Sequence, residues 1–121
     1  MKKIRKEFEV WANKELAKIQ NTLLLNDYRL SPTKPSNTDA SLCMFRYPYK
    51  DIEIQYSETI FTDWVNGKKA ETREILMHEM FHVVTDKLYA KAGSRFVGNG
   101  ELEDEREQLT DHLANIVLKL T

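Results

Sequence analysis

The sequence predicts an α+β fold in which an N-terminal helix and two long later helices flank a small three-stranded sheet, antiparallel or mixed. Three observations carry this prediction. Apolar residues recur at helical spacing near both ends of the chain and again after residue 68. They alternate with polar residues over residues 51–57, as in a half-buried strand. The chain of 121 residues suits one domain, spanning residues 1–121, with one modest core.

The first half of the chain is expected to supply one helix and the whole sheet. A helix over residues 3–25 carries an apolar stripe that packs across the sheet. Proline and serine predict a loop over 31–39, and strands are expected over three segments: 27–31, 42–47 and 51–57. The last two strands should pair as a hairpin around a turn at 48–50. The single cysteine, Cys43, is most simply a small buried apolar group on the second strand.

The second half of the chain is expected to be helical. Ser57 is a residue type that caps helices, so a short helix follows it and ends near the Asn66-Gly67 pair. A long helix is predicted over 68–92, a glycine-rich loop over 93–100, and a final amphipathic helix over 101–120. The last two helices are expected to pack against each other.

Composition excludes several classes of function. The net charge of −1 gives no overall attraction to nucleic acid or to anionic lipid. No apolar run reaches the roughly 20 residues that span a bilayer, and no signal peptide is recognisable at the N-terminus. One cysteine excludes an internal disulfide and fits a reducing compartment. We therefore expect a cytoplasmic monomer that binds neither nucleic acid nor membrane.

The chemistry is concentrated in segment 74–84, an apolar run that contains an H-E-x-x-H motif at His78, Glu79 and His82. On a helix, residues i and i+4 lie one turn apart on the same face, so His78 and His82 can hold one metal ion. Glu79 lies about 100° further round the helix, where it can reach a water molecule on that metal. The sequence therefore predicts the site of a zinc hydrolase.

A chance match is the alternative, in which a structural helical protein carries two core histidines. The surroundings of the motif argue against it. The helix is apolar nearly all round, and two imidazoles and a carboxylate buried there with nothing to bind would cost several kcal/mol. The apolar residues are Ile75, Leu76, Met77, Met80, Phe81, Val83 and Val84. Metal analysis of the purified protein separates the two interpretations.

A catalytic zinc site needs a third protein ligand and an open position. Thr85 occupies the place where a glycine would indicate a motif with a third histidine, so that branch is not favoured. Downstream residues offer many candidates, several of which only complement the helix dipole. These candidates are Glu101, Glu103, Asp104, Glu105, Glu107, Asp111 and His112.

Residues 107–114 resemble the glutamate helix of the gluzincin zinc metallopeptidases, in which Glu-x-x-x-Asp has a small residue before the Asp and another three after it. The resemblance implies that Glu107 binds zinc and that Asp111 hydrogen-bonds to His78. The small positions are matched by Thr110 and Ala114. Glu103, one turn earlier, is the second choice for the ligand, although its own Glu-x-x-x-Asp pattern fails because positions 106 and 107 are Arg and Glu.

The size of the chain is similar to that of the smallest such proteins, the minigluzincins and the ImmA/IrrE-type and SprT-like domains. The resemblance covers roughly residues 40–118, and residues 52–57 resemble the strand that borders the clefts of these proteins. It implies a zinc-dependent metalloendopeptidase acting on a protein or peptide. Zn²⁺ would polarise the scissile carbonyl, and Glu79 would act as general base.

Two points stay open from the sequence. The donor that stabilises the oxyanion could be any of four residues: Tyr56, Tyr89, Arg95 or His112. The chain could also be a zinc-binding regulatory or interaction module of the same fold with little turnover, because it lacks the second subdomain that walls the cleft of larger peptidases.

Overall fold

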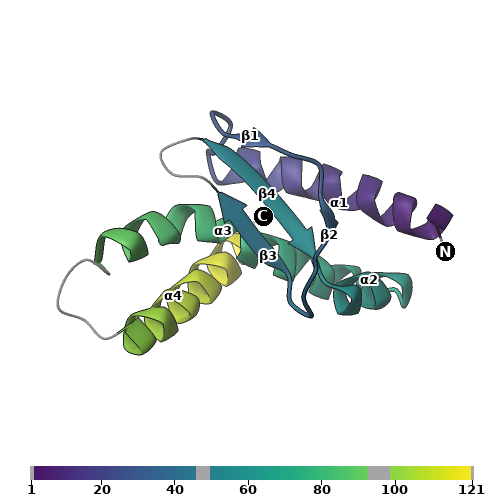
Figure 1. Cartoon of the computed structure of the whole chain (residues 1–121). Helices are drawn as coiled ribbons and strands as arrows, with labels where there is room; N and C mark the ends of the chain where they lie inside the picture. The colour runs from purple at the N-terminus through teal and green to yellow at the C-terminus, as the bar shows by residue number, and fades with distance from the viewer. Residues whose placement is uncertain (1, 46–49, 93–98, 121) are drawn as a thin grey trace.

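The computed structural model describes residues 2–45, 50–92 and 99–120, and the elements below lie within them (Figure 1). They confirm the predicted α+β fold class. In chain order the elements are α1 (Lys2–Thr22), β1 (Arg29–Leu30), β2 (Lys34–Pro35), β3 (Leu42–Phe45), β4 (Asp51–Tyr56), α2 (Glu58–Val65), α3 (Lys69–Ala92) and α4 (Asn99–Leu120).

The sheet is mixed and is built around β4. β3 runs antiparallel along one side of β4, with Leu42 opposite Gln55 and Phe45 opposite Ile52, so the predicted pairing is confirmed. Most of the turn predicted between these strands lies outside the described residues. β1 and β2 both run parallel to β4, and their partner residues follow one another along it. The described residues thus hold four short strands, whereas the sequence predicted three.

The extra strand, β2, lies inside the segment that was predicted to be a loop. Pro32 and Pro35 are loop signals because neither has an N–H group to donate to a neighbouring strand. Side chains repair the pairing between them: the hydroxyl of Thr33 donates to the carbonyl of Ile54 at 2.8 Å, and the Thr33 N–H donates to the side chain of Asn13, also at 2.8 Å. The segment that contains the two prolines is therefore held to β4 and α1 by these two hydrogen bonds.

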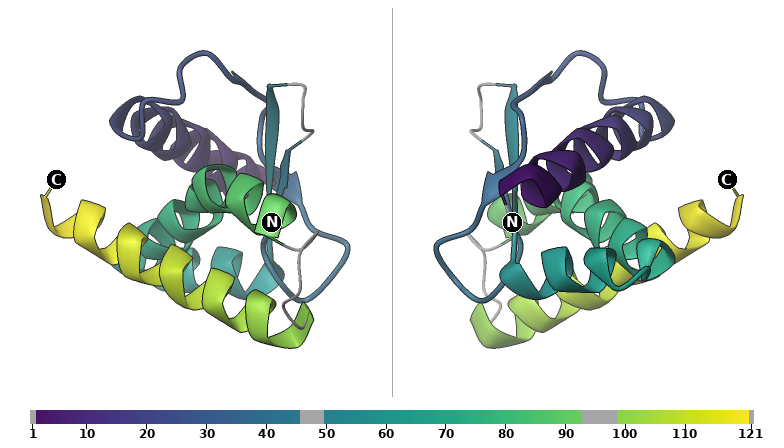
Figure 2. Two further views of the ribbon diagram at one scale, coloured as in Figure 1. Left: turned by 90° about the vertical axis from the view of Figure 1, so that its left-hand side faces the viewer. Right: turned by 90° about the vertical axis from the view of Figure 1, so that its right-hand side faces the viewer.

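The helices gather on one side of the sheet (Figure 2). β4 shows the alternation that the sequence predicts, with Ile52, Ile54 and Tyr56 buried in the core and the residues between them half-buried. Phe8 of α1 is fully buried and forms edge-on ring contacts with Tyr56 and Phe61, at centroid distances of 4.7 and 5.6 Å. This aromatic contact fixes α1 on the sheet, as the apolar stripe of the N-terminal helix predicts.

Both ends of α2 agree with the prediction, because a capping serine and a glycine mark them. The Ser57 hydroxyl accepts a hydrogen bond from the Ile60 N–H at 3.2 Å and caps α2, and Gly67 takes a φ of +87° just after it. α1 ends at Thr22, three residues before the predicted end. Leu24 adopts a left-handed conformation there, with a φ of 59°. Glycine or asparagine usually occupies such a position, so the leucine gave no sign of the helix end.

α3 and α4 lie side by side and run antiparallel (Figure 1). α4 begins at Asn99, two residues earlier than predicted, and the predicted loop is otherwise outside the described residues. Where the helices cross, the buried hydroxyl groups of Thr85 and Thr110 share a hydrogen bond of 2.7 Å, and Ala114 is 1% exposed. In the part of the chain that the structure describes, no helix is long and apolar enough to cross a membrane.

Candidate metal centre

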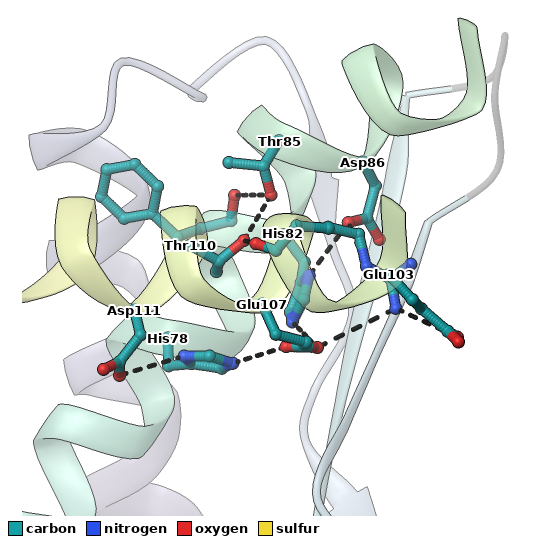
Figure 3. Close-up of polar contacts among 10 residues, drawn as sticks. His78, His82, Thr85, Asp86, Glu103, Glu107, Thr110 and Asp111 are labelled. Atoms are coloured by element: carbon teal, nitrogen blue, oxygen red, sulfur yellow. Dashed lines mark hydrogen bonds and ion pairs between the residues drawn. The ribbon is translucent and has the colours of Figure 1, made fainter. Parts of the chain in front are cut away.

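α3 and α4 bring the predicted metal ligands together (Figure 3). Glu107 reaches across from α4 between the two histidines of α3, and each of its carboxylate oxygens faces one imidazole. Oε2 lies 3.4 Å from Nε2 of His78, and Oε1 lies 3.2 Å from Nε2 of His82. Three atoms that commonly bind zinc thus converge on one point from two helices.

The neighbours of Glu107 on α4 take different positions. Asp111, one turn later, places Oδ1 3.5 Å from Nδ1 of His78, on the other side of that ring from Glu107. Glu103, one turn earlier, pairs with Arg106 at 3.8 Å. Within the described residues, the carboxylates paired with the two imidazoles are therefore Glu107, Asp111 and Asp86. Glu103, the second choice for the ligand, is not among them.

Asp86 is a site residue that the sequence reasoning missed. Its Oδ1 lies 2.9 Å from Nδ1 of His82. The other nitrogen of the same ring, Nε2, is the one near Glu107. The available signal was the same i, i+4 spacing that links the histidines, because Asp86 follows His82 by one turn of α3. Each imidazole therefore has one nitrogen near Glu107 and the other near an aspartate.

The donor set fits a tetrahedral metal. Ligand atoms around a four-coordinate zinc with bonds of 2.0–2.2 Å lie roughly 3.3–3.6 Å apart. Nε2 of His78 lies 3.4 Å from Oε2 of Glu107, and Nε2 of His82 lies 3.2 Å from Oε1, which is close to that spacing. His78, Glu79 and His82 also form a group whose ligand atoms all lie within 4.8 Å of one another. The two carboxylates have different partners: Glu107 contacts both Nε2 atoms, whereas Glu79 accepts a hydrogen bond from the Cys43 backbone.

Glu79 lies beside the histidines in a poorly solvated place. Burial raises the pKa of Glu79 to about 7, against the lowering effect of the His82 charge, and the charges of Glu107 and Asp86 raise it further. A hydrogen bond from the Cys43 backbone acts in the opposite direction. Near neutral pH this carboxyl group can therefore either accept or release a proton.

His82 is the more enclosed of the two histidines, with its side chain 8% exposed against 22% for His78. Burial by itself lowers the pKa of His82, but the hydrogen bond to Asp86 and the negative charges of Asp86, Glu107 and Glu79 outweigh it and raise the pKa. This negative surrounding favours positive charge at the site, whether a proton or a metal cation.

The strand next to the site is β3. Its Cys43 backbone bonds to Glu79, whereas β4 lies between β3 and the β1–β2 edge. The Cys43 bond places β3 beside Glu79, and the expectation that residues 52–57 border a cleft stays a prediction. The Cys43 thiol is largely shielded from water, and burial raises its pKa, as its expected apolar role requires.

Of the four candidates for an oxyanion donor, the structure excludes one. The Tyr56 hydroxyl donates to Glu9 at 2.6 Å and accepts from Arg5 at 3.2 Å, so it is committed to α1. Burial, with the hydrogen bond to Glu9, raises the pKa of Tyr56 to about 12. His112 is exposed on α4. The side chain of Tyr89, and the whole of Arg95, lie outside the described parts of the chain.

Comparison with known proteins identifies no family for this chain. No family model, no curated protein and no solved structure matches the chain. The likeness to gluzincins therefore rests on the motif residues and their geometry, and it stays a prediction.

Proposed function

We propose that this protein is a zinc-dependent metallopeptidase that hydrolyses peptide bonds of a protein or peptide. One observation carries the proposal: the Glu107 carboxylate lies between the Nε2 atoms of His78 and His82, with Glu79 next to His78 on the same helix. If the two histidines were only structural, neither a carboxylate from α4 between them nor a half-buried carboxyl group beside them would be needed.

His78, His82 and Glu107 would hold the zinc, and their two imidazoles and one carboxylate are a ligand set found in catalytic zinc sites. When bound, zinc supplies a Lewis acid that polarises the carbonyl and acidifies water. Three protein ligands leave one position of a tetrahedron open for substrate or water. Asp111, 3.5 Å from Nδ1 of His78, would hold that ring in its ligating orientation.

Glu79 would carry the proton during hydrolysis. Burial raises its pKa above that of an exposed carboxyl group, which would help it take a proton from the attacking water and return it to the leaving amine. The hydrogen bond from the Cys43 backbone would hold the carboxylate in place between α3 and β3. Neither task requires Glu79 to be a metal ligand.

The strand beside the site supports a peptide as the substrate. β3 pairs with β4 on one side, and no other described strand pairs with it. An extended chain can add to a strand edge through main-chain hydrogen bonds, a common mode of peptide recognition. We expect the protein to act in the cytoplasm, where its single cysteine would stay reduced, and we expect it to be a monomer.

The first prediction tests the chemistry with Glu79→Gln. Glutamine keeps the shape and hydrogen bonding of the residue but cannot act as a base at neutral pH. The variant should bind about one zinc per chain, as the wild type should, and cleave a mixed peptide pool about 10² times more slowly or worse. Zinc content and cleavage are measured on the same samples. Glu74→Gln, an exposed change on the same helix, is the matched control.

The outcomes separate the possible functions. Undiminished cleavage by zinc-loaded Glu79→Gln protein would rule out the proposed mechanism. Zinc binding by the wild type without cleavage of unfolded proteins or peptides would support the regulatory or interaction module instead. If the wild type fails to bind added zinc, both the peptidase and the zinc-binding module are ruled out, and a structural protein with a chance motif is left.

A further inference from the structure

Asp86 makes the shortest polar contact among the histidine contacts described above, yet no part of the proposed chemistry has used it. Its Oδ1 lies 2.9 Å from Nδ1 of His82, compared with 3.5 Å between Asp111 and His78. The Asp86 side chain is 22% exposed and that of His82 is 8% exposed, so water competes little for this bond. A short, shielded carboxylate–imidazole bond is what fixes a metal-binding histidine in many sites.

We propose that Asp86 is a positioning residue that orients His82 toward the metal, an inference that rests on the proposed metal site. By accepting a hydrogen bond from the Nδ1–H group, Asp86 sets the tautomer in which Nε2 carries the free lone pair. That Nε2 atom is the one that faces Glu107 at 3.2 Å. The carboxylate also makes the imidazole more basic and hence a better ligand.

Arg106 links this positioning residue to the other helix. Its Nε lies 3.8 Å from the same Oδ1 of Asp86, and its Nη2 lies 3.9 Å from Oε1 of Glu107. One guanidinium thus lies close to the partner of the second histidine and to the third ligand. Its positive charge holds two carboxylates near each other that would otherwise repel, so Arg106 is the second member of the positioning pair.

The two aspartates then have equivalent tasks on different helices. Asp111 on α4 faces the His78 ring, and Asp86 on α3 faces the His82 ring. A purely structural ion pair between Asp86 and Arg106 would stabilise the crossing of α3 and α4 but would leave metal affinity unchanged once the protein is folded. Metal affinity and the coordination spectrum therefore distinguish the positioning role from a structural one.

The experiment measures zinc affinity of the full chain by competition with a chromophoric chelator, and records the visible spectrum of the Co²⁺-substituted protein. Asp86→Ala, which removes the acceptor, should weaken zinc binding about 10–100-fold. Asp86→Asn, which keeps a neutral acceptor in place, should recover part of that loss and is the variant to use if Asp86→Ala does not fold. Both should alter the Co²⁺ bands, while Asp104→Asn, an exposed change on α4, should change neither readout.

Arg106→Gln tests the second step of the inference. It should weaken zinc binding in the wild-type background and weaken it less in the Asp86→Ala background, because only the contact of Arg106 with Glu107 is left to lose there. Wild-type affinity and an unchanged Co²⁺ spectrum in folded Asp86→Ala or Asp86→Asn protein would overturn the inference and leave the proposed function standing. A wild-type protein that binds neither metal would overturn the metal site itself.

Discussion

Glu79 and Glu107 are two carboxylates beside one pair of histidines, and their surroundings differ in ways that suit the two roles proposed for them. Glu107 is 46% exposed and directs both oxygens at imidazole nitrogens, as a ligand does. Glu79 is held by the Cys43 backbone in a place where burial raises its pKa to about 7, as suits a base. In the proposed site, Glu107 would therefore bind the metal and Glu79 would transfer the proton.

The choice between Glu107 and Glu103 as third ligand gives the second prediction. Glu107→Ala removes both contacts to the histidine nitrogens and should weaken zinc binding far more than Glu103→Ala, which removes only a pairing with Arg106. Asp111→Ala should fall between them, at about 10–100-fold. Chelator competition measures all three. Equal losses at 103 and 107 would show that the glutamate helix has been placed in the wrong register.

At this scale helical spacing predicted the histidine pair, because i and i+4 residues are neighbours, whereas Glu107 was predicted only from the resemblance to the glutamate helix. The same rule would have found Asp86, but an aspartate in a helix is common and carries no signal until its partner is known. Tyr56 was a reasonable oxyanion donor from its place on a strand near the motif. Its hydroxyl belongs instead to Arg5 and Glu9, a contact that no sequence spacing shows.

At the scale of elements, the end of α1 shows a local conflict between sequence and structure. The helix ends in a turn where the Leu25 N–H reaches back to the Gln20 carbonyl at 2.9 Å, and this turn needs a left-handed residue at position 24. Leu24 fills it at a φ of 59° with its side chain 84% exposed. The apolar side chain therefore gains little from burial while its backbone is strained.

Leu24→Gly is the third prediction and should stabilise the protein. Glycine enters the left-handed region without a Cβ clash, and we expect a gain of about 0.5–1 kcal/mol after the added freedom of the unfolded chain is counted. Urea unfolding at a fixed zinc concentration measures it. Leu24→Ala removes the exposed side chain but keeps the Cβ. A gain in that control equal to the gain with glycine would show that the backbone conformation is not the cause.

Elements with strong periodicity or clear caps were predicted well, and β2 was not. The alternation in β4 and the Ser57 and Gly67 boundaries of α2 are local signals. β2 pairs with β4 although Pro32 and Pro35 interrupt its edge, because the Thr33 hydroxyl takes the place of a backbone donor. Such a replacement depends on a tertiary neighbour, so it could not be predicted from the segment alone.

At the scale of the whole molecule, the candidate metal centre joins two helices that the chain connects only through residues 93–98. Two of the proposed ligands come from α3 and one from α4, and the Thr85–Thr110 bond lies at the same crossing. A metal bound there would act as a clamp between the helices. Its binding energy would then add to the stability of the fold.

The fourth prediction follows from this clamp. Zinc at 100 times its dissociation constant should add about 2.7 kcal/mol to the stability, and a strong chelator should lower the melting temperature accordingly. Hydrogen exchange should show α4 losing more protection than α1, because Glu107 lies on α4. The Glu107→Ala variant is the control and should show little response to the chelator. Equal loss of protection in both helices would contradict the clamp.

The two prolines of the β1–β2 edge have a consequence for how copies of this protein meet in a crowded solution. An uninterrupted outer strand offers a row of free donors and acceptors on which a second chain can align and aggregate. Here that row is broken at Pro32 and Pro35, and the Thr33 N–H between them is already taken by Asn13. The rim of the sheet formed by β1 and β2 therefore offers fewer free donors for pairing with a strand of a second copy.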